Sequence, residues 1–213
     1  STHLHIQHED MWQFRLDRLN TATKDLKAFL PSPATVTMDN NRFTLDHLTL
    51  DTTTGRLQAK GEFNEEKIDF SARIDHIPLA FLEPLIHRDL SGTATVNLDL
   101  SGALVDPAVQ VKVHVQDYRI PGAENPESMV LEVKMDAKQQ EKRFLINGAL
   151  FGLGDAPFTI TASIPAHLSL KPLGFHLNET ADVKAGLKGH LDLTILKALP
   201  GMDDQNVKGL VDV

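Results

Sequence analysis

Apolar and polar residues alternate with a period of two along most of this chain. Between Val109 and Val115 every second residue is a valine, and the residues in between are polar. Just upstream, the run from Ala94 to Leu100 alternates in the same way. Such alternation predicts strands with one apolar face and one polar face. No helical segment lies between the two runs, so nothing between them can cover the apolar face.

The same alternation recurs in short segments along the rest of the chain. Each segment is bounded by Gly, Asp, Asn or Pro, the residues that favour turns. We expect further strands in residues 35–38, 43–45, 48–63 with a turn at Thr54 and Gly55, 68–74, 129–137, 143–150, 158–164 and 181–195.

Two segments depart from this pattern and predict one or two short helices. Residues 20–30 place apolar side chains at helical spacing, and Pro31 and Pro33 follow as a stop signal. Residues 78–86 hold too many apolar residues in a row for a half-exposed strand. Since Pro78 suits the first turn of a helix, we expect a short apolar plug there.

Strands with one apolar face and short connections predict an antiparallel meander. Burial of one aliphatic side chain is worth about 1.5–3 kcal/mol, so a sheet of this size needs cover for its apolar face. A closed barrel, a β-sandwich, or one long sheet curled into a trough would each provide it. Periodicity alone does not choose among these three.

The length of 213 residues is compatible with a single all-β domain covering residues 1–213. The chain begins and ends within alternating runs, so we expect a fragment of a longer protein. A weak internal repeat relates residues 68–100 to residues 189–213, because in each a strand leads into a short apolar segment containing Pro and then a Gly-bearing strand.

The charge balance excludes several classes of partner. With 21 Lys and Arg against 29 Asp and Glu, the net charge is −8. Nucleic acid requires a basic surface, so we expect no nucleic-acid binding, and the same balance disfavours docking on an anionic bilayer. The absence of Cys excludes disulfides and thiol nucleophiles. No apolar run approaches the roughly 18–20 residues of a membrane-spanning helix, and the first residues do not resemble a signal peptide.

Motifs that carry chemistry are weak throughout the chain. His3, His5 and His8 lie near one another in sequence, but no acid stands at a convincing spacing for a metal site. The Gly-rich residues 147–157 lack the Lys and Ser or Thr of a phosphate-binding loop, and a strand, bend and turn is expected there. No hydrolase or metalloprotease motif occurs. We therefore expect no catalytic residues, no metal and no cofactor, and a protein that is not an enzyme.

The order of several short motifs resembles a known family. These motifs are G-x-L-x-x-x-G at Gly55–Gly61, an apolar Pro-Leu segment at Pro78–Leu85, L-S-G at Leu90–Gly92, and L-x-G-x-L-x-x-P at Leu100–Pro107. Together, residues 55–122 resemble the TamB family, the inner-membrane component of the translocation and assembly module of Gram-negative bacteria.

The resemblance implies a long curled sheet with a hydrophobic trough, called a β-taco, in a periplasmic segment of a protein anchored in the inner membrane. The family partners an outer-membrane barrel, TamA, and is associated with autotransporter assembly and protein secretion. Its AsmA-like relatives resemble bridges that carry phospholipid between membranes. The anchor and the barrel-partnering region would lie outside this chain.

Three hypotheses follow for the apolar face. On the first, it lines a groove for phospholipid acyl chains. On the second, it shelters unfolded outer-membrane β-strands as a chaperone or scaffold, and on the third it forms the dry core of a closed module. On the first hypothesis, a smooth aliphatic lining suits acyl chains, which need apolar area and little directionality. The expected groove residues are Val109, Val111, Val113, Val115, Leu131, Val133, Met135, Phe158, Ile160, Val183 and Leu187.

Overall fold

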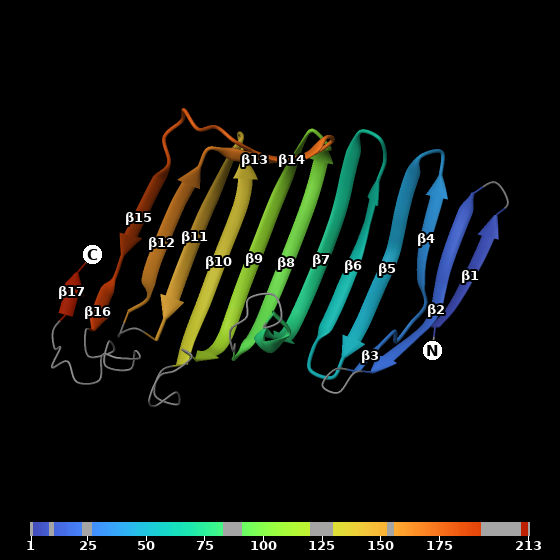
Figure 1. Ribbon diagram of the computed structural model, residues 1–213, viewed down its shortest axis with the longest axis horizontal. Coiled ribbons are helices and arrows are strands. Elements are labelled where there is room, and N and C mark those ends of the chain that lie inside the picture. The colour runs from blue at the N-terminus through green and yellow to red at the C-terminus, as the bar shows by residue number, and fades with distance from the viewer. Residues whose placement is uncertain are drawn as a thin grey trace.

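A computed structural model describes residues 2–8, 11–22, 27–82, 91–119, 130–152, 156–192 and 210–212. The main feature of these residues is one antiparallel sheet of 13 strands (Figure 1). Its strands are β1 (Thr2–His8), β2 (Trp12–Ala22), β3 (Lys27–Phe29), β4 (Ala34–Asp39), β5 (Arg42–Thr52), β6 (Arg56–Phe63), β7 (Lys67–Pro78), β8 (Thr93–Ala103), β9 (Asp106–Arg119), β10 (Val130–Gln140), β11 (Arg143–Phe151), β12 (Phe158–Ile164) and β15 (Lys184–Lys188).

The strands follow one another across the sheet almost in chain order, as the meander prediction requires. Strands β3 and β4 are the exception, because they lie end to end and both pair with β2 and β5. Pro31 and Pro33 separate them. Proline has no N–H group for the hydrogen-bond ladder, so these residues interrupt what is otherwise one strand position.

The predicted helix in residues 20–30 is wrong. Asn20 to Ala22 end β2 and pair with β3, and residues 23–26 lie outside the described part of the chain. Ala28 and Leu30 are buried while Phe29 is exposed, which is the period of a strand. A helix of this length is marginal on its own in water, and pairing with β2 satisfies the same backbone groups within a large sheet.

The predicted apolar plug begins as expected with a short helical turn. This turn is the 3-10 helix η1 (Leu79–Leu82), which follows β7 directly. The amide of Leu79 donates to the carbonyl of Gly92, 2.9 Å away, and so joins the turn to the start of β8. Residues 83–90 lie outside the described part. So do residues 193–209, which make up most of the second copy of the weak repeat at residues 189–213.

Tight turns connect strands at the upper rim of the sheet in Figure 1. Two-residue turns join β4 to β5 at Asn40–Asn41, β8 to β9 at Leu104–Val105, and β10 to β11 at Glu141–Lys142. Asn40 and Asn41 have φ values of 43° and 66°, and Glu141 and Lys142 have values of 51° and 57°. Positive φ at both central residues is typical of hairpin turns whose twist matches that of the strands.

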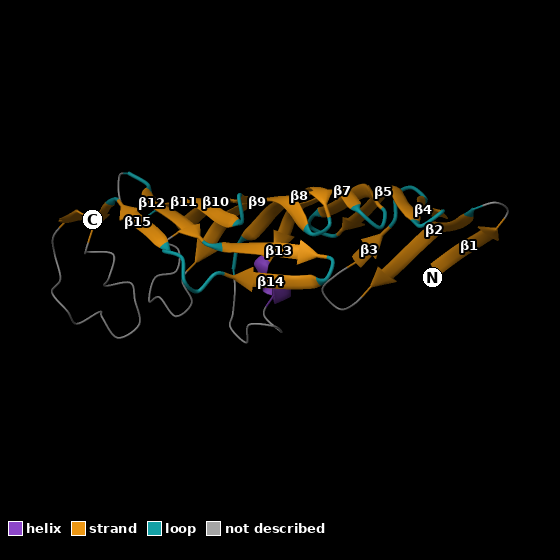
Figure 2. Cartoon of the chain, turned by 90° about the horizontal axis from the view of Figure 1, so that it is seen from above, coloured by secondary structure: helices purple, strands orange, loops and turns teal. Residues whose placement is uncertain are grey.

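Two small sheets complete the described structure. Strands β13 (Ala166–Leu170) and β14 (Leu173–Leu177) form a hairpin that stands off one face of the large sheet (Figure 2). The hairpin is tied to the rim by a bond from the Leu170 amide to the Leu104 carbonyl, 2.7 Å long. Strands β16 (His190–Asp192) and β17 (Leu210–Asp212) form the other pair.

The large sheet is curled and open, which confirms the predicted architecture. Bulges in β5, β7 and β9 shift the register and increase the local twist. Its outermost strands, β1 and β15, do not pair with each other, so the sheet is not a closed barrel. The alternative of a β-sandwich is wrong for the described residues, because no second large sheet stands over the apolar face. Figure 2 shows only the short β13–β14 hairpin and the η1 turn on that side of the described structure.

Candidate functional site

One face of the large sheet is apolar from edge to edge. Because directly opposed residues in neighbouring strands lie on the same face, the register defines this face residue by residue. One row of opposed residues runs from β15 to β5 through Leu187, Ile160, Gly148, Met135, Val113, Val96, Ile74, Leu57 and Leu50. We call this side of the sheet the apolar face.

Most of the predicted groove residues meet on the apolar face. Val113 and Val115 lie opposite Met135 and Val133, and Ile160 lies opposite Leu187. The remaining predicted residues in the strands of this face are Val109, Val111 and Phe158, which oppose Leu100, Leu98 and Leu150.

Two predicted residues are placed differently. Leu131 pairs with Tyr118, but its side chain lies outside the described part of the structure. Val183 precedes β15, does not take part in the ladder, and is exposed.

The apolar face is much wider than the predicted groove. It continues through β8, β7, β6 and β5 to β4 and β2, where Phe14 lies opposite Val36. Phe43 and Phe63 stack on it with ring centroids 4.7 Å apart. The alternation that identified the groove strands is equally clear in these segments, so it was sufficient to identify this extension.

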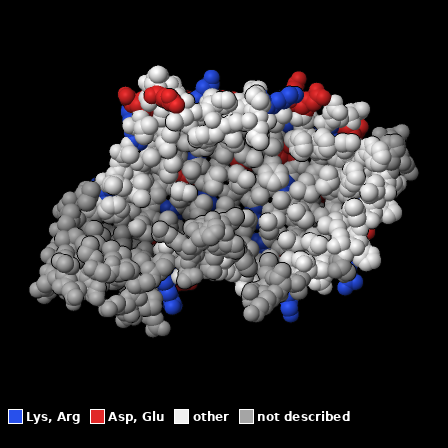
Figure 3. All heavy atoms as spheres, in the orientation of Figure 1, with Lys and Arg blue, Asp and Glu red and all other residues white. Residues whose placement is uncertain are grey.

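A row along the middle of the apolar face contains several small side chains. The row next to the one described above contains Ala185, Ala162, Ile146, Ala137, Val111, Leu98, Ala72, Ala59 and Leu48. Five of these residues are alanine, so the floor is close to the backbone there. In the space-filling view the centre of the molecule is hollowed, and most charged atoms lie along the rims (Figure 3).

The β13–β14 hairpin forms a wall beside this hollow. The ring of Phe175 packs against Phe144 of the apolar face, with centroids 5.7 Å apart. Leu173 and Leu177 share the face of β14 on which Phe175 lies, and all three are exposed. This wall is absent from the predicted groove. The alternation on both sides of Lys171 and Pro172 is a hairpin signal that could have indicated it.

A buried glutamine holds the hairpin against the sheet. Gln139 of β10 is only 7% exposed and lies in line with the apolar residues of that strand. Its Nε2 donates to the Pro107 carbonyl at 2.9 Å and to Asp106 Oδ1 at 3.0 Å. Its Oε1 accepts a hydrogen bond from the Leu168 amide at 2.7 Å. Each end of the amide thus has a partner, which makes its burial tolerable.

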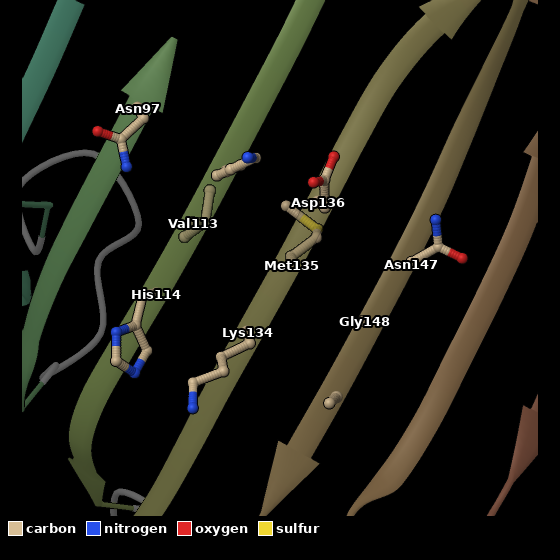
Figure 4. Close-up of a pocket in the computed structure, with 10 residues that line it drawn as sticks. Asn97, Val113, His114, Lys134, Met135, Asp136, Asn147 and Gly148 are labelled. Atoms are coloured by element: carbon tan, nitrogen blue, oxygen red, sulfur yellow. The ribbon is translucent and has the colours of Figure 1, made fainter.

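The opposite face of the sheet is polar and has a shallow cavity of about 450 Å³ over β8 to β11 (Figure 4). Beside it, Glu132 Oε1 lies 2.8 Å from Lys134 Nζ and 2.6 Å from His114 Nε2. Hydrogen bonds lower the pKa of Glu132; the bond from Lys134 has the larger effect and the bond from His114 the next. Charges of both signs line the cavity, and its described lining offers no hydroxyl or thiol nucleophile.

Within the described ranges, no three His, Cys, Asp or Glu side chains are grouped so as to hold a metal ion. His3 and His5 are exposed on β1, and the side chain of His8 lies outside the described part. No helix of the described residues is long and apolar enough to cross a membrane.

Comparison with protein-family models, with curated proteins and with solved structures found no match for this chain. The features that indicate a function are therefore the geometry of the apolar face and the sequence motifs. Of these, the geometry is the more specific. It defines which side chains share a surface and which of them are left uncovered.

Proposed function

We propose that the apolar face is an open trough that binds the acyl chains of phospholipid. The observation that carries this proposal is that, in the part of the chain that the structure describes, the face extends across the sheet with only the β13–β14 hairpin and the η1 turn on that side (Figure 2). Among the described residues, few apolar side chains are buried, namely Ala28, Leu30, Ala34, Val109, Ala166, Pro107 and Pro165. An apolar surface of this extent in water is characteristic of a binding surface.

The lining favours acyl chains over ligands that need directed hydrogen bonds. Along the groove strands it consists mainly of Val, Leu, Ile, Ala and Met, with Phe144 and Phe158. The row that contains the alanines provides an apolar track across these strands. Burial of apolar area is non-directional, so an aliphatic chain can lie anywhere along this track. Charged head groups would stay at the rims, because burial of an unpaired charge is costly.

The motifs shared with the TamB family support a cellular setting for this trough. We propose that the chain is a periplasmic segment of a protein anchored in the inner membrane, and that it helps to carry phospholipid between the inner and outer membranes for outer-membrane biogenesis. The membrane anchor and the contact with an outer-membrane barrel would belong to regions outside this chain.

Native mass spectrometry of the purified chain, followed by organic extraction, tests the proposal. We expect phospholipid to co-purify with the protein. The variant Val111→Asp puts a carboxylate on the alanine row and should reduce bound lipid by about tenfold or more, because the carboxylate would have to be desolvated by the chain.

The matched control is Lys112→Asp, on the same strand but on the polar face, which should retain its lipid. Circular dichroism of both variants checks that the sheet is intact. A folded wild-type chain that carries no lipid, even after incubation with phospholipid vesicles, would contradict the proposal.

One observation favours a second function, the sheltering of unfolded outer-membrane β-strands. The outer edge of β1 has no partner strand in the described structure, and Leu4 and Ile6 on it are exposed. An open edge can accept an added strand. If this is the function, peptides from outer-membrane strands should bind, and His5→Pro should abolish their binding while leaving lipid content unchanged.

A further inference from the structure

A second cavity, of about 320 Å³, lies at the upper rim beside the base of the β13–β14 hairpin. The turn between β10 and β11 contributes Glu141, Lys142 and Arg143 to its lining. The hairpin contributes His167 and His176, which are directly opposed on β13 and β14. The cavity is therefore built where two separate parts of the chain meet.

Arg143, one of the two permanent cations of this cavity, is held in place by the fold. Arg143 Nε donates to Ser163 Oγ at 2.8 Å, and its Nη2 donates to the Asp182 carbonyl at 2.8 Å. Its Nη1 makes no hydrogen bond within the described part of the chain. The imidazole rings of His167 and His176 stack with centroids 4.9 Å apart. The site thus offers fixed N–H donors before any ligand arrives.

The charge of the lining has the opposite sign to that of the whole protein. The lining contains two permanent cations, Lys142 and Arg143, and one carboxylate, Glu141. The chain as a whole carries a net charge of −8. A cation-rich concave site on an acidic protein selects anions, and Arg with Lys is the usual combination for phosphate.

The cavity adjoins the apolar hollow. Leu177 belongs to its lining and also to the exposed apolar stripe of β14, with Phe175 two residues away. Phe175 in turn packs on Phe144 of the apolar face. An amphiphile could therefore place a charged head in the cavity and its chain along the stripe of the hairpin.

We propose that this rim cavity binds the phosphate group of a phospholipid whose acyl chains lie on the apolar face. The inference rests on the proposed lipid function and adds a head-group preference to it: anionic phospholipids should bind in preference to uncharged amphiphiles. The phosphate would be recognised by Lys142 and Arg143, with the His167–His176 pair as further donors.

Titration calorimetry with three soluble probes tests this inference. The probes are dihexanoyl phosphatidylglycerol, octyl glucoside as an uncharged amphiphile, and glycerol 3-phosphate as a head group without chains. The variant Lys142→Gly removes a cation at a position with a φ of 57°, where glycine is favoured, so folding should be retained. The matched control Lys60→Met removes an exposed cation on β6, far from the cavity in sequence.

We expect Lys142→Gly to weaken phosphatidylglycerol binding by about tenfold and to leave octyl glucoside binding unchanged. Glu141→Gln should strengthen phosphatidylglycerol binding, because it removes the opposing charge, and Lys60→Met should have no effect. In NMR spectra, the Hε1 signals of His167 and His176 should shift on addition of phosphatidylglycerol but not of octyl glucoside.

Equal phosphatidylglycerol affinity in the wild type, Lys142→Gly and Glu141→Gln would overturn the rim site while leaving acyl-chain binding intact. Binding of glycerol 3-phosphate as tight as that of phosphatidylglycerol, with both weakened by Lys142→Gly, would overturn the lipid source and indicate a site for free phosphate. If neither amphiphile bound and only glycerol 3-phosphate did, the proposed lipid function itself would fail.

Discussion

Three of the motif glycines, Gly55, Gly61 and Gly92, are placed where a neighbouring strand leaves no room for a side chain, whereas Gly102 has space for one. A Cβ atom at Gly61 would lie 2.5 Å from the carbonyl oxygen of Asp69, and one at Gly92 would lie 2.5 Å from that of Gln116. At Gly55 it would lie 2.7 Å from the carbonyl oxygen of His76. The spacing of these glycines therefore reports close backbone approaches in the curled sheet.

Substitution of Gly92 should be costly. Its φ of 98° is unfavourable for a residue with a Cβ, and in Gly92→Ala that Cβ meets the backbone of β9, which cannot move as a side chain can. We expect a loss of about 1–3 kcal/mol in the free energy of unfolding, measured by urea denaturation. Gly148→Ala is the control, since its nearest contact is at 3.6 Å; an equal loss in both variants would contradict the steric explanation.

Glu132 predicts a pH-dependent contribution to stability. Because hydrogen bonds from Lys134 and His114 lower its pKa in the folded protein, its contribution is present above the pKa of the unfolded chain and is lost as pH falls through the lowered value. Its side chain is part-exposed, so Glu132→Gln should cost less than about 1 kcal/mol at neutral pH.

Urea denaturation of Glu132→Gln and the wild type at neutral pH and at about pH 3 measures this contribution. The difference between the two proteins should shrink in acid. Glu66→Gln is the control, because Glu66 lies in an exposed turn and its carboxylate makes no ion pair in the described structure. A difference that grew in acid would contradict the assignment.

At the scale of the element, alternation predicted the strands well because each has one apolar and one polar side. It located β8 and β9 and the apolar faces that they share. It failed for residues 20–30, where apolar residues at helical spacing competed with pairing to β2, and only the pairing is visible in three dimensions. Prediction of elements was thus limited by partners that are distant in sequence.

The candidate site was predictable in part for the same reason. Its groove valines follow from alternation, but the wall formed by β13 and β14 depends on a contact between Phe144 and Phe175. Gln139 shows most clearly what alternation cannot predict, because a polar residue at an apolar position only interrupts the pattern. Its role emerges only from the partners it meets on β9 and β13.

Gln139 should therefore decide whether the hairpin stays attached. Gln139→Met keeps the size of the side chain but leaves the Leu168 amide and the Pro107 carbonyl without this partner, which should cost about 1–3 kcal/mol. Hydrogen exchange at Leu168 should become faster than in the wild type. Gln140→Met, on the exposed side of β10, should leave this rate unchanged; protection retained in Gln139→Met would show that packing alone holds the hairpin.

At the scale of the whole molecule, the open sheet exposes unusually much surface. The accessible area is 13896 Å² for a chain of 23.5 kDa, whereas a compact monomer of that mass exposes about 9,800 Å². The excess is expected for an open sheet that carries, in the described structure, only a short hairpin and one helical turn on its apolar side (Figure 2). In water, this surface will favour any process that covers it, whether lipid binding or association between copies.

Association can occur through the open edge of β1 or through the apolar face, and the two routes can be separated. Ile6→Lys puts an inward-pointing charge on the edge strand, a device that natural edge strands use against pairing. If copies associate through the edge, sedimentation velocity at increasing concentration should show a smaller associated fraction for Ile6→Lys than for the wild type. Gln7→Lys, on the polar side of the same strand, is the control for charge alone.

If copies associate through the apolar face, the order of the variants reverses. Val111→Asp should then suppress association, and so should added phospholipid, since lipid and a second copy would compete for the same surface. Because Val111 lies on β9, in the interior of the sheet, an aspartate there leaves the β1 edge unchanged. We expect the lipid-free chain to associate through this face, and association unaffected by both Val111→Asp and lipid would contradict that expectation.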